Sequence, residues 1–154
     1  MTPQEFIAAI APAAQASMRT TKIPASFVVA DAALESGWGS SLEAQQAFNL
    51  FGIKADPSWH GDTWARSTRE FLRGQWVFMP ALWRKYSDWL GSINDHAAFL
   101  LDNPRYRSAF RFTDGESFAR AVAAAGYATD PDYANKIIEV MRAHSLADLD
   151  TITT

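Results

Sequence analysis

A change of hydrophobic pattern in the middle of the chain limits its possible folds more than any other feature. Before and after it, apolar residues recur at the spacing of helices, three and four residues apart. Between His60 and Tyr86 the sequence is instead rich in Trp, Thr, Phe and Val, and Gly74 separates two stretches, roughly 63–72 and 75–82. Such stretches around a turn residue are typical of a hairpin. The pattern therefore predicts an α+β fold, mainly helical, with one β-hairpin inserted.

Start and stop signals divide the remaining sequence into helices. Thr2-Pro3-Gln4-Glu5 is a capping box and predicts a first helix to about Ser17, followed by a polar link. Pro24 opens a second helix that leads to Glu35 and ends at Gly37 or Gly39. Further helices are expected at Ser41 to Ala47, from a cap at Ser87 to Asn103, from Thr113 or Asp114 to Gly126, and from Asp130-Pro131 onward.

Length and composition indicate one compact unit. The chain has 154 residues, of which 48% are hydrophobic and 20% charged, as in ordinary globular proteins. No internal repeat or low-complexity linker interrupts it. We expect a single domain over residues 1–147, with the hairpin lobe at about 60–86, and a C-terminal tail over 148–154.

Charge and missing residue types exclude several classes of function. The net charge is −3 without a basic cluster, so neither nucleic acid nor an anionic membrane surface is an expected partner. No apolar run is long enough for membrane insertion. The chain has no cysteine, and its three histidines lack the paired spacing of metal ligands, so we expect no metal site and no cofactor.

Glu35 is the first candidate for chemistry. It stands at the end of an apolar helix and is followed by Ser36-Gly37-Trp38-Gly39. The partial negative charge of a helix C-terminus and exclusion of water by Trp38 would both raise the pKa of the Glu35 carboxyl. A general acid that acts at neutral pH needs such a shift. The alternative interpretation is a surface glutamate at a helix end.

Two further residues are candidates beside it. Glu70 shares a strand face with Trp64, Arg66 and Thr68, and could lie across a cleft from Glu35. A pair of carboxyl groups is relevant because glycan hydrolysis commonly uses two, one of which donates a proton. Its alternative is a solvated strand face. Tyr127 follows Gly126 in a tightly built turn, where it could serve the site or simply close the core.

The segment Ala32-Ala33-Leu34-Glu35-Ser36-Gly37-Trp38-Gly39 resembles the glucosaminidases of glycoside hydrolase family 73. That family includes flagellar rod-associated wall hydrolases, autolysins and some phage endolysins. The resemblance continues in the family's order across nearly the whole chain. Its further blocks are 49–54, 59–61, 68–70, 86–87, 92–93 with 95–96, 103–106, 125–131 and 133–134.

The resemblance implies a lysozyme-like fold with a groove between a helical lobe and a hairpin lobe. It implies hydrolysis of the β-1,4 bond after N-acetylglucosamine and before N-acetylmuramic acid in peptidoglycan. Glu35 matches the family's catalytic acid, Glu70 its second carboxylate, and Tyr127 its motif tyrosine near the reacting sugar. Two roles for Glu70 stay open: activating water, or assisting attack by the substrate's own acetamido group.

The sequence also indicates residues for substrate binding. Where the family usually has glutamine, this chain has Asp31, one helical turn before Glu35. If both face the groove, like-charge repulsion would raise the pKa of Glu35 further; alternatively, Asp31 only accepts a hydrogen bond. Expected substrate-binding residues are Asp31, Trp38, Asn49, Phe51, Trp64 and Thr68, whereas Trp76, Trp83 and Trp89 are expected to pack.

Two other readings of the sequence remain. A lytic transglycosylase or muramidase on the same fold would act on the same polymer, and a non-catalytic glycan-binding assembly module would need no acid. The N-terminus lacks the basic start of a secretory signal. We therefore expect a monomeric phage or prophage endolysin that stays cytoplasmic until released and then acts on the cell wall.

Overall fold

The computed structural model describes residues 1–151, with only the backbone of Glu70, and its fold is α+β and mainly helical, as predicted. The elements are α1 (Pro3–Thr21), α2 (Ala25–Ser36), α3 (Leu42–Gln46), β1 (Thr63–Leu72), β2 (Gln75–Arg84), α4 (Trp89–Asp102), the 3-10 helix η1 (Pro104–Arg111), α5 (Gly115–Ala124), α6 (Tyr133–Ala143) and the 3-10 helix η2 (Leu146–Asp150).

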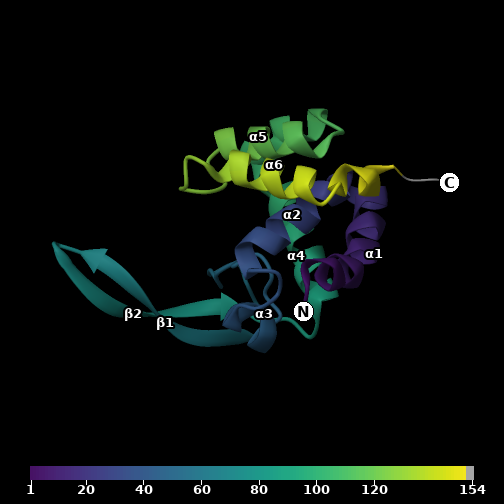
Figure 1. Ribbon diagram of the computed structural model, residues 1–154. Helices are drawn as coiled ribbons and strands as arrows, with labels where there is room; N and C mark the ends of the chain where they lie inside the picture. The colour runs from purple at the N-terminus through teal and green to yellow at the C-terminus, as the bar shows by residue number, and fades with distance from the viewer. Residues whose placement is uncertain (152–154) are drawn as a thin grey trace.

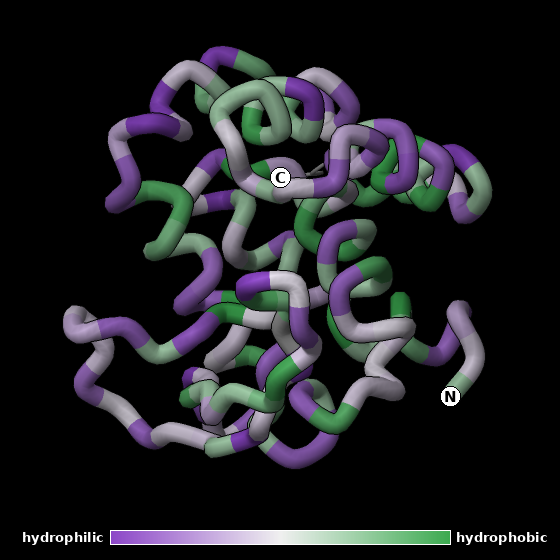
Figure 2. The backbone as a smooth tube through the Cα atoms, turned by 90° about the vertical axis from the view of Figure 1, so that its left-hand side faces the viewer, coloured by the Kyte–Doolittle hydropathy of each residue, from purple (hydrophilic) through white to green (hydrophobic). Residues whose placement is uncertain are grey.

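Helix α2 lies at the centre of the helical body. It contacts α1, α5, α6 and η2, which surround it in Figure 1. Ten of its twelve residues are buried, as expected for a helix that is apolar on nearly every side. Figure 2 shows hydrophobic segments running through the interior and hydrophilic segments on the outer turns. Only the last turn of α2, with Glu35, reaches the surface.

The predicted helix boundaries are confirmed where a cap decides them. Thr2 and Glu5 form the reciprocal capping box of α1, and Gly37 ends α2 with φ 56°. Helix α1, however, continues to Thr21 instead of ending near Ser17. The polar residues that follow Ser17 mark an exposed helix face and not a helix end, because Met18 remains buried among the core residues.

Other differences from the sequence prediction lie at polar turns. Asp88, and not Ser87, caps α4 by accepting a hydrogen bond from the N–H of Gly91. Helix α6 begins at Tyr133, after a turn at Pro131 and Asp132. Both 3-10 helices were missed, since runs this short have weak sequence signals.

The segment assigned to a tail begins inside the last helical turn. Residues 148–150 belong to η2, and both carboxylate oxygens of Asp150 accept hydrogen bonds from Ser26 at the start of α2, at 2.8 and 2.6 Å. Burial raises the pKa of Asp150 despite these bonds. The rest of the predicted tail, 152–154, lies outside the described residues.

The two strands form the predicted hairpin. Thr63 pairs with Arg84 and Leu72 with Gln75, so β2 is two residues longer than expected. The turn residues Arg73 and Gly74 both have positive φ, 52° and 78°, which suits the twist of a two-residue hairpin loop. In Figure 1 the hairpin extends away from the helices. Its exposed large apolar residues are Phe71, Leu72, Trp76, Phe78, Met79 and Leu82.

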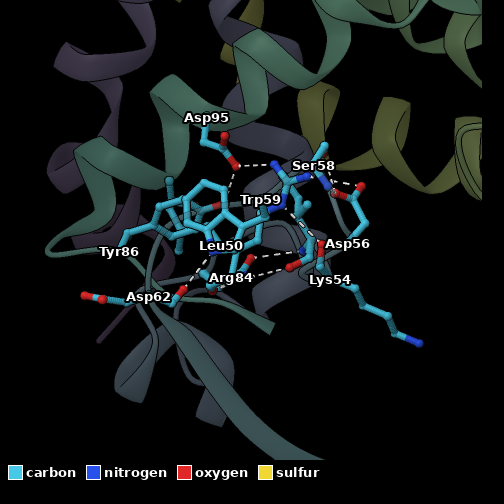
Figure 3. A network of polar contacts seen from close by, with 12 residues as sticks. Leu50, Lys54, Asp56, Ser58, Trp59, Asp62, Arg84, Tyr86 and Asp95 are labelled. Atoms are coloured by element: carbon cyan, nitrogen blue, oxygen red, sulfur yellow. Dashed lines mark hydrogen bonds and ion pairs between the residues drawn. The ribbon is translucent and has the colours of Figure 1, made fainter. Parts of the chain in front are cut away.

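A polar network attaches the base of the hairpin to the helical body (Figure 3). The guanidinium of Arg84 is buried and donates to Asp95 of α4 at 2.9 Å and to the carbonyl oxygen of Lys54 at 3.2 Å. It also lies over the ring of Trp59, at 5.0 Å from the centroid. Tyr86 donates to the same Asp95 carboxylate. The last residue of β2 is thereby held against α4.

Candidate active site

A groove of about 820 Å³ runs over the end of α2. Its lining comes from α2, the segment after α3, α4, the turn before α6, and α6 itself: Leu34, Glu35, Phe51, Gly52, Ile53, Lys54, Asp56, Phe99, Tyr127, Ala128, Thr129, Asp130, Tyr133 and Lys136. A second cavity of about 270 Å³, lined by Ser41, Glu43, Asn49 and Trp83, also includes Glu35 and Gly52. Glu35 therefore stands where the two cavities adjoin.

Among the titratable groups that the structure describes, Glu35 has the shift that acid catalysis requires. Its side chain is accessible to solvent from the groove, yet protein surrounds it on the remaining sides. This desolvation, followed by the negative charge of Asp31, raises the pKa of Glu35 from 4.5 to about 7. About half of the molecules therefore keep this proton at neutral pH, so Glu35 can donate it to a leaving group.

Asp31 lies beneath the groove and not in it. Its side chain is completely buried, so the expectation that it contacts substrate is wrong. One carboxylate oxygen accepts a hydrogen bond from the Tyr127 hydroxyl at 2.5 Å, and the other from the Tyr133 hydroxyl at 2.7 Å. Asp31 thus acts on Glu35 through its charge and not by facing the substrate.

Tyr127 joins the groove to this buried carboxylate. Its ring lines the groove, while its hydroxyl points inward to Asp31 and His96. Burial, and then the charge of Asp31, raise the pKa of Tyr127 well above its usual value. The tyrosine therefore stays protonated and cannot serve as a base at ordinary pH. Both interpretations from the sequence hold in part, because the ring packs against the core and borders the site.

The aromatic residues divide differently from the expectation. Phe51 lines the groove, as expected. Trp38 has a positive φ of 58° and packs edge-on against Phe6 of α1 and against His144. It is absent from the groove lining. Trp83, expected to pack, lines the smaller cavity beside Glu35.

Asn49 organises the groove wall. It is buried, and its side-chain amide donates to the carbonyl oxygens of Ile53 and Arg84, both at 2.9 Å. Its carbonyl oxygen accepts from the N–H of Ile53 at 3.1 Å. These three bonds fix the loop that carries Phe51 and Lys54. Asn49 borders the smaller cavity, but its amide is used within the protein.

The candidates on the hairpin lie at different distances along β1 from its base, where the hairpin joins the helical body. Trp64 pairs with Trp83 at the base of the hairpin and is half-buried, and Thr68 pairs with Met79. The backbone of Glu70 pairs with Val77, closer to the turn; its side chain lies outside the described residues. Arg66 of β1 forms an ion pair at 2.8 Å with Glu43 of α3, one of the residues that line the smaller cavity.

Sequence reasoning did not find two of the residues that surround Asp31. The sequence places Tyr133 and His96 in matched blocks but gives neither a role in the site, and the histidines are weighed there only as metal ligands. The signal was present, because three of the matched blocks each contain one partner of Asp31. Among the described residues there is no group of three potential metal ligands and no helix that could cross a membrane.

A helical body with an inserted hairpin, and a groove carboxyl that holds its proton near neutral pH, are features expected of a glycoside hydrolase. Residues 11–146 match the family model Glucosaminidase, described as mannosyl-glycoprotein endo-beta-N-acetylglucosaminidase. The chain belongs to this family and is a glycoside hydrolase with a lysozyme-like fold.

Similar proteins include peptidoglycan hydrolase FlgJ of Vibrio parahaemolyticus, 41% identical over 143 residues, which cover 90% of this chain and 46% of that protein. The chain spans about half the length or less of the curated FlgJ relatives it matches. The glycoside hydrolase domain of Salmonella typhimurium FlgJ, truncated at its C-terminus, aligns with a TM-score of 0.80 at 33% identity, over 94% and 98% of the two chains. The catalytic domain of the autolysin Auto from Listeria monocytogenes aligns with a TM-score of 0.86 at 29% identity, over 96% and 86%.

Proposed function

We propose that this domain hydrolyses peptidoglycan glycan strands at the β-1,4 bond between N-acetylglucosamine and N-acetylmuramic acid, with Glu35 as the general acid. The observation that carries the proposal is the pKa of about 7 for a carboxyl in the groove. The relatives named peptidoglycan hydrolase support the choice of polymer.

In this proposal Glu35 protonates the departing sugar oxygen as the glycosidic bond breaks. The charge of buried Asp31 raises the pKa of Glu35, so Glu35 keeps its proton until the proton is transferred to the departing sugar. The second carboxylate is Glu70, which either activates water or assists attack by the substrate's acetamido group. The two residues come from different elements, Glu35 from α2 and Glu70 from β1.

Digestion of purified peptidoglycan, followed by mass spectrometry of the products, tests both the bond and the acid. The proposal expects fragments that end in a reducing N-acetylglucosamine. The variant Glu35→Gln keeps the shape of the side chain but has no proton to donate, so cleavage should fall by about a thousandfold or more. Circular dichroism confirms that the variant is folded.

Four outcomes would contradict the proposal. Anhydro-muramic ends would mean that the domain is a lytic transglycosylase, and reducing muramic ends would mean a muramidase. Cleavage that persists in Glu35→Gln would mean that another residue is the acid. Binding of glycan strands without any cleavage by the wild type would favour the non-catalytic assembly module.

The biological setting is a further proposal. We expect an endolysin that lyses cells from inside after the inner membrane is breached, and the FlgJ relatives suggest wall remodelling as a second setting. Cytoplasmic expression in a Gram-negative host, with and without permeabilisation of the inner membrane, distinguishes them. Lysis that follows permeabilisation within minutes supports the endolysin. Intact cells after permeabilisation, with an active enzyme in extracts, contradict it.

A further inference from the structure

A buried histidine completes the cluster beneath Glu35. The His96 side chain is 1% exposed and lies on α4, the helix that follows the hairpin in the chain. Its Nε2 atom lies 2.8 Å from the Tyr127 hydroxyl oxygen and 3.4 Å from a carboxylate oxygen of Asp31. The catalytic proposal made above gives no role to this residue.

The hydrogen bonds determine where the proton of His96 resides. The Tyr127 hydroxyl has one proton and donates it to Asp31 at 2.5 Å. Its oxygen can then only accept a hydrogen bond from His96, so Nε2 must carry a hydrogen. The other ring nitrogen, Nδ1, is buried without a hydrogen-bond partner among the described residues. A second proton there would be a buried donor left unpaired, which is costly. The arrangement therefore fits a neutral ring protonated on Nε2.

Aromatic rings surround His96, and Asp31 is the acidic residue that lies beside its Nε2 atom. Phe51 stacks face to face on His96 with centroids 3.8 Å apart, and Phe27 of α2 stacks from another side. Tyr127 contacts the ring edge-on, with Tyr106 of η1 and Tyr133 of α6 behind it. A neutral His96 leaves the charge of Asp31 uncompensated inside this cage.

We propose that His96 is a positioning residue: by donating from Nε2 to the Tyr127 hydroxyl, it directs the tyrosine proton onto Asp31 and keeps that carboxylate ionised and uncompensated beneath Glu35. The inference rests on the proposed function for its effect on catalysis. The protonation state of the His96 ring is independent of the proposed function and is measurable without substrate.

Two substitutions at His96 test separately the role of its N–H donor and the role of its aromatic ring. His96→Phe retains an aromatic ring beneath Phe51 but removes the N–H, whereas His96→Gln removes the ring but places an amide N–H near the position of Nε2. We expect His96→Phe to lower kcat by roughly tenfold to a hundredfold, the order of effect of a misplaced reacting group, with little change in KM. His96→Gln should stay within about threefold of the wild type, a change that is small against that scale.

The reverse ranking, with His96→Phe active and His96→Gln impaired, would overturn the proposal, because stacking would then matter and not the donor. A double-mutant cycle with Tyr127→Phe provides the second test if one variant folds poorly. Because His96 is proposed to act through the Tyr127 hydroxyl, His96→Phe should have no further effect in that background. Additive losses would contradict the proposal.

Nitrogen-15 NMR of the histidine rings supplies a readout that needs no substrate. The proposal expects His96 in the neutral form with its proton on Nε2 at pH 7. A proton on Nδ1, or a doubly protonated ring, would overturn it. If the wild type fails to cleave peptidoglycan while the NMR result holds, the proposed function fails and the positioning of the Tyr127 proton stands.

Discussion

At the scale of single residues, one negative charge affects one proton across a turn of helix. Asp31 is buried and bonded to two tyrosine hydroxyls, and its charge is the second cause of the raised pKa of Glu35, after desolvation. Asp31→Asn removes the charge, so Glu35 should lose its proton at lower pH. We predict that the alkaline limb of the kcat–pH profile moves downward.

The matched control is Asp130→Asn. Asp130 also lines the groove, but Lys136 binds its carboxylate at 2.5 Å, and the two side chains are 40% and 51% exposed. Its charge is thus compensated and screened by solvent, and the limb should move little. A limb that stays in place in Asp31→Asn, or moves equally in the control, would show that burial alone sets the pKa of Glu35.

The raised pKa of Glu35 also lowers the free energy of unfolding at neutral pH. Below pH 4.5 the folded and unfolded chains both hold the Glu35 proton. Between pH 4.5 and about 7 the unfolded chain releases it while the folded chain retains it, so stability falls across this window and stays lower above it. We predict that Glu35→Gln has a higher Tm than the wild type above pH 7 and an equal Tm near pH 4. Equal values at both pH values in thermal scans would argue against the raised pKa.

At the scale of elements, the attachment of the hairpin depends on Arg84. Its guanidinium is 8% exposed and pairs with Asp95, which is 20% exposed. Arg84→Met keeps an apolar stem but removes the guanidinium that lies over Trp59 and leaves Asp95 without its cation. Loss of one partner of a buried pair costs about 3 kcal/mol of unfolding free energy, measurable by urea denaturation. Arg66→Met breaks the more exposed pair with Glu43 and should cost at most about 1 kcal/mol. Equal losses would contradict a special role for Arg84.

The elements also show what the sequence can and cannot predict. The capping box of Thr2, the helix end at Gly37 and the turn at Gly74 act locally, and the corresponding boundaries are confirmed. The errors arise where tertiary packing decides: the polar end of α1 continues a helix because Met18 is buried, and Trp38 turns toward Phe6. His96, Tyr127 and Tyr133 stand in three matched blocks, but only the tertiary fold shows that they share Asp31.

At the scale of the whole molecule, the protein consists of a packed helical body and a projecting arm. The buried core residues come from the helices and the segments between them, and the outer part of the hairpin contributes none of them. The arm is exposed along its apolar residues, with Phe78 77% and Trp76 59% accessible. Its strands pair with each other, while Arg84, Trp83 and Arg66 connect its base to the body. The body should therefore fold without the outer arm.

A shortened hairpin tests this division. Residues 67–80 are replaced by Asn-Gly, so that Arg66 and Ala81, which are paired in the native register, flank a two-residue turn. We predict an unchanged helical circular dichroism spectrum and a Tm within about 5 °C of the wild type, which for a domain of this size corresponds to a change of about 1–2 kcal/mol. Cleavage of peptidoglycan should be lost, because the deletion removes Glu70. A Tm lowered by far more would mean that the arm supports the body, and retained cleavage would mean that Glu35 works without a carboxylate from the hairpin.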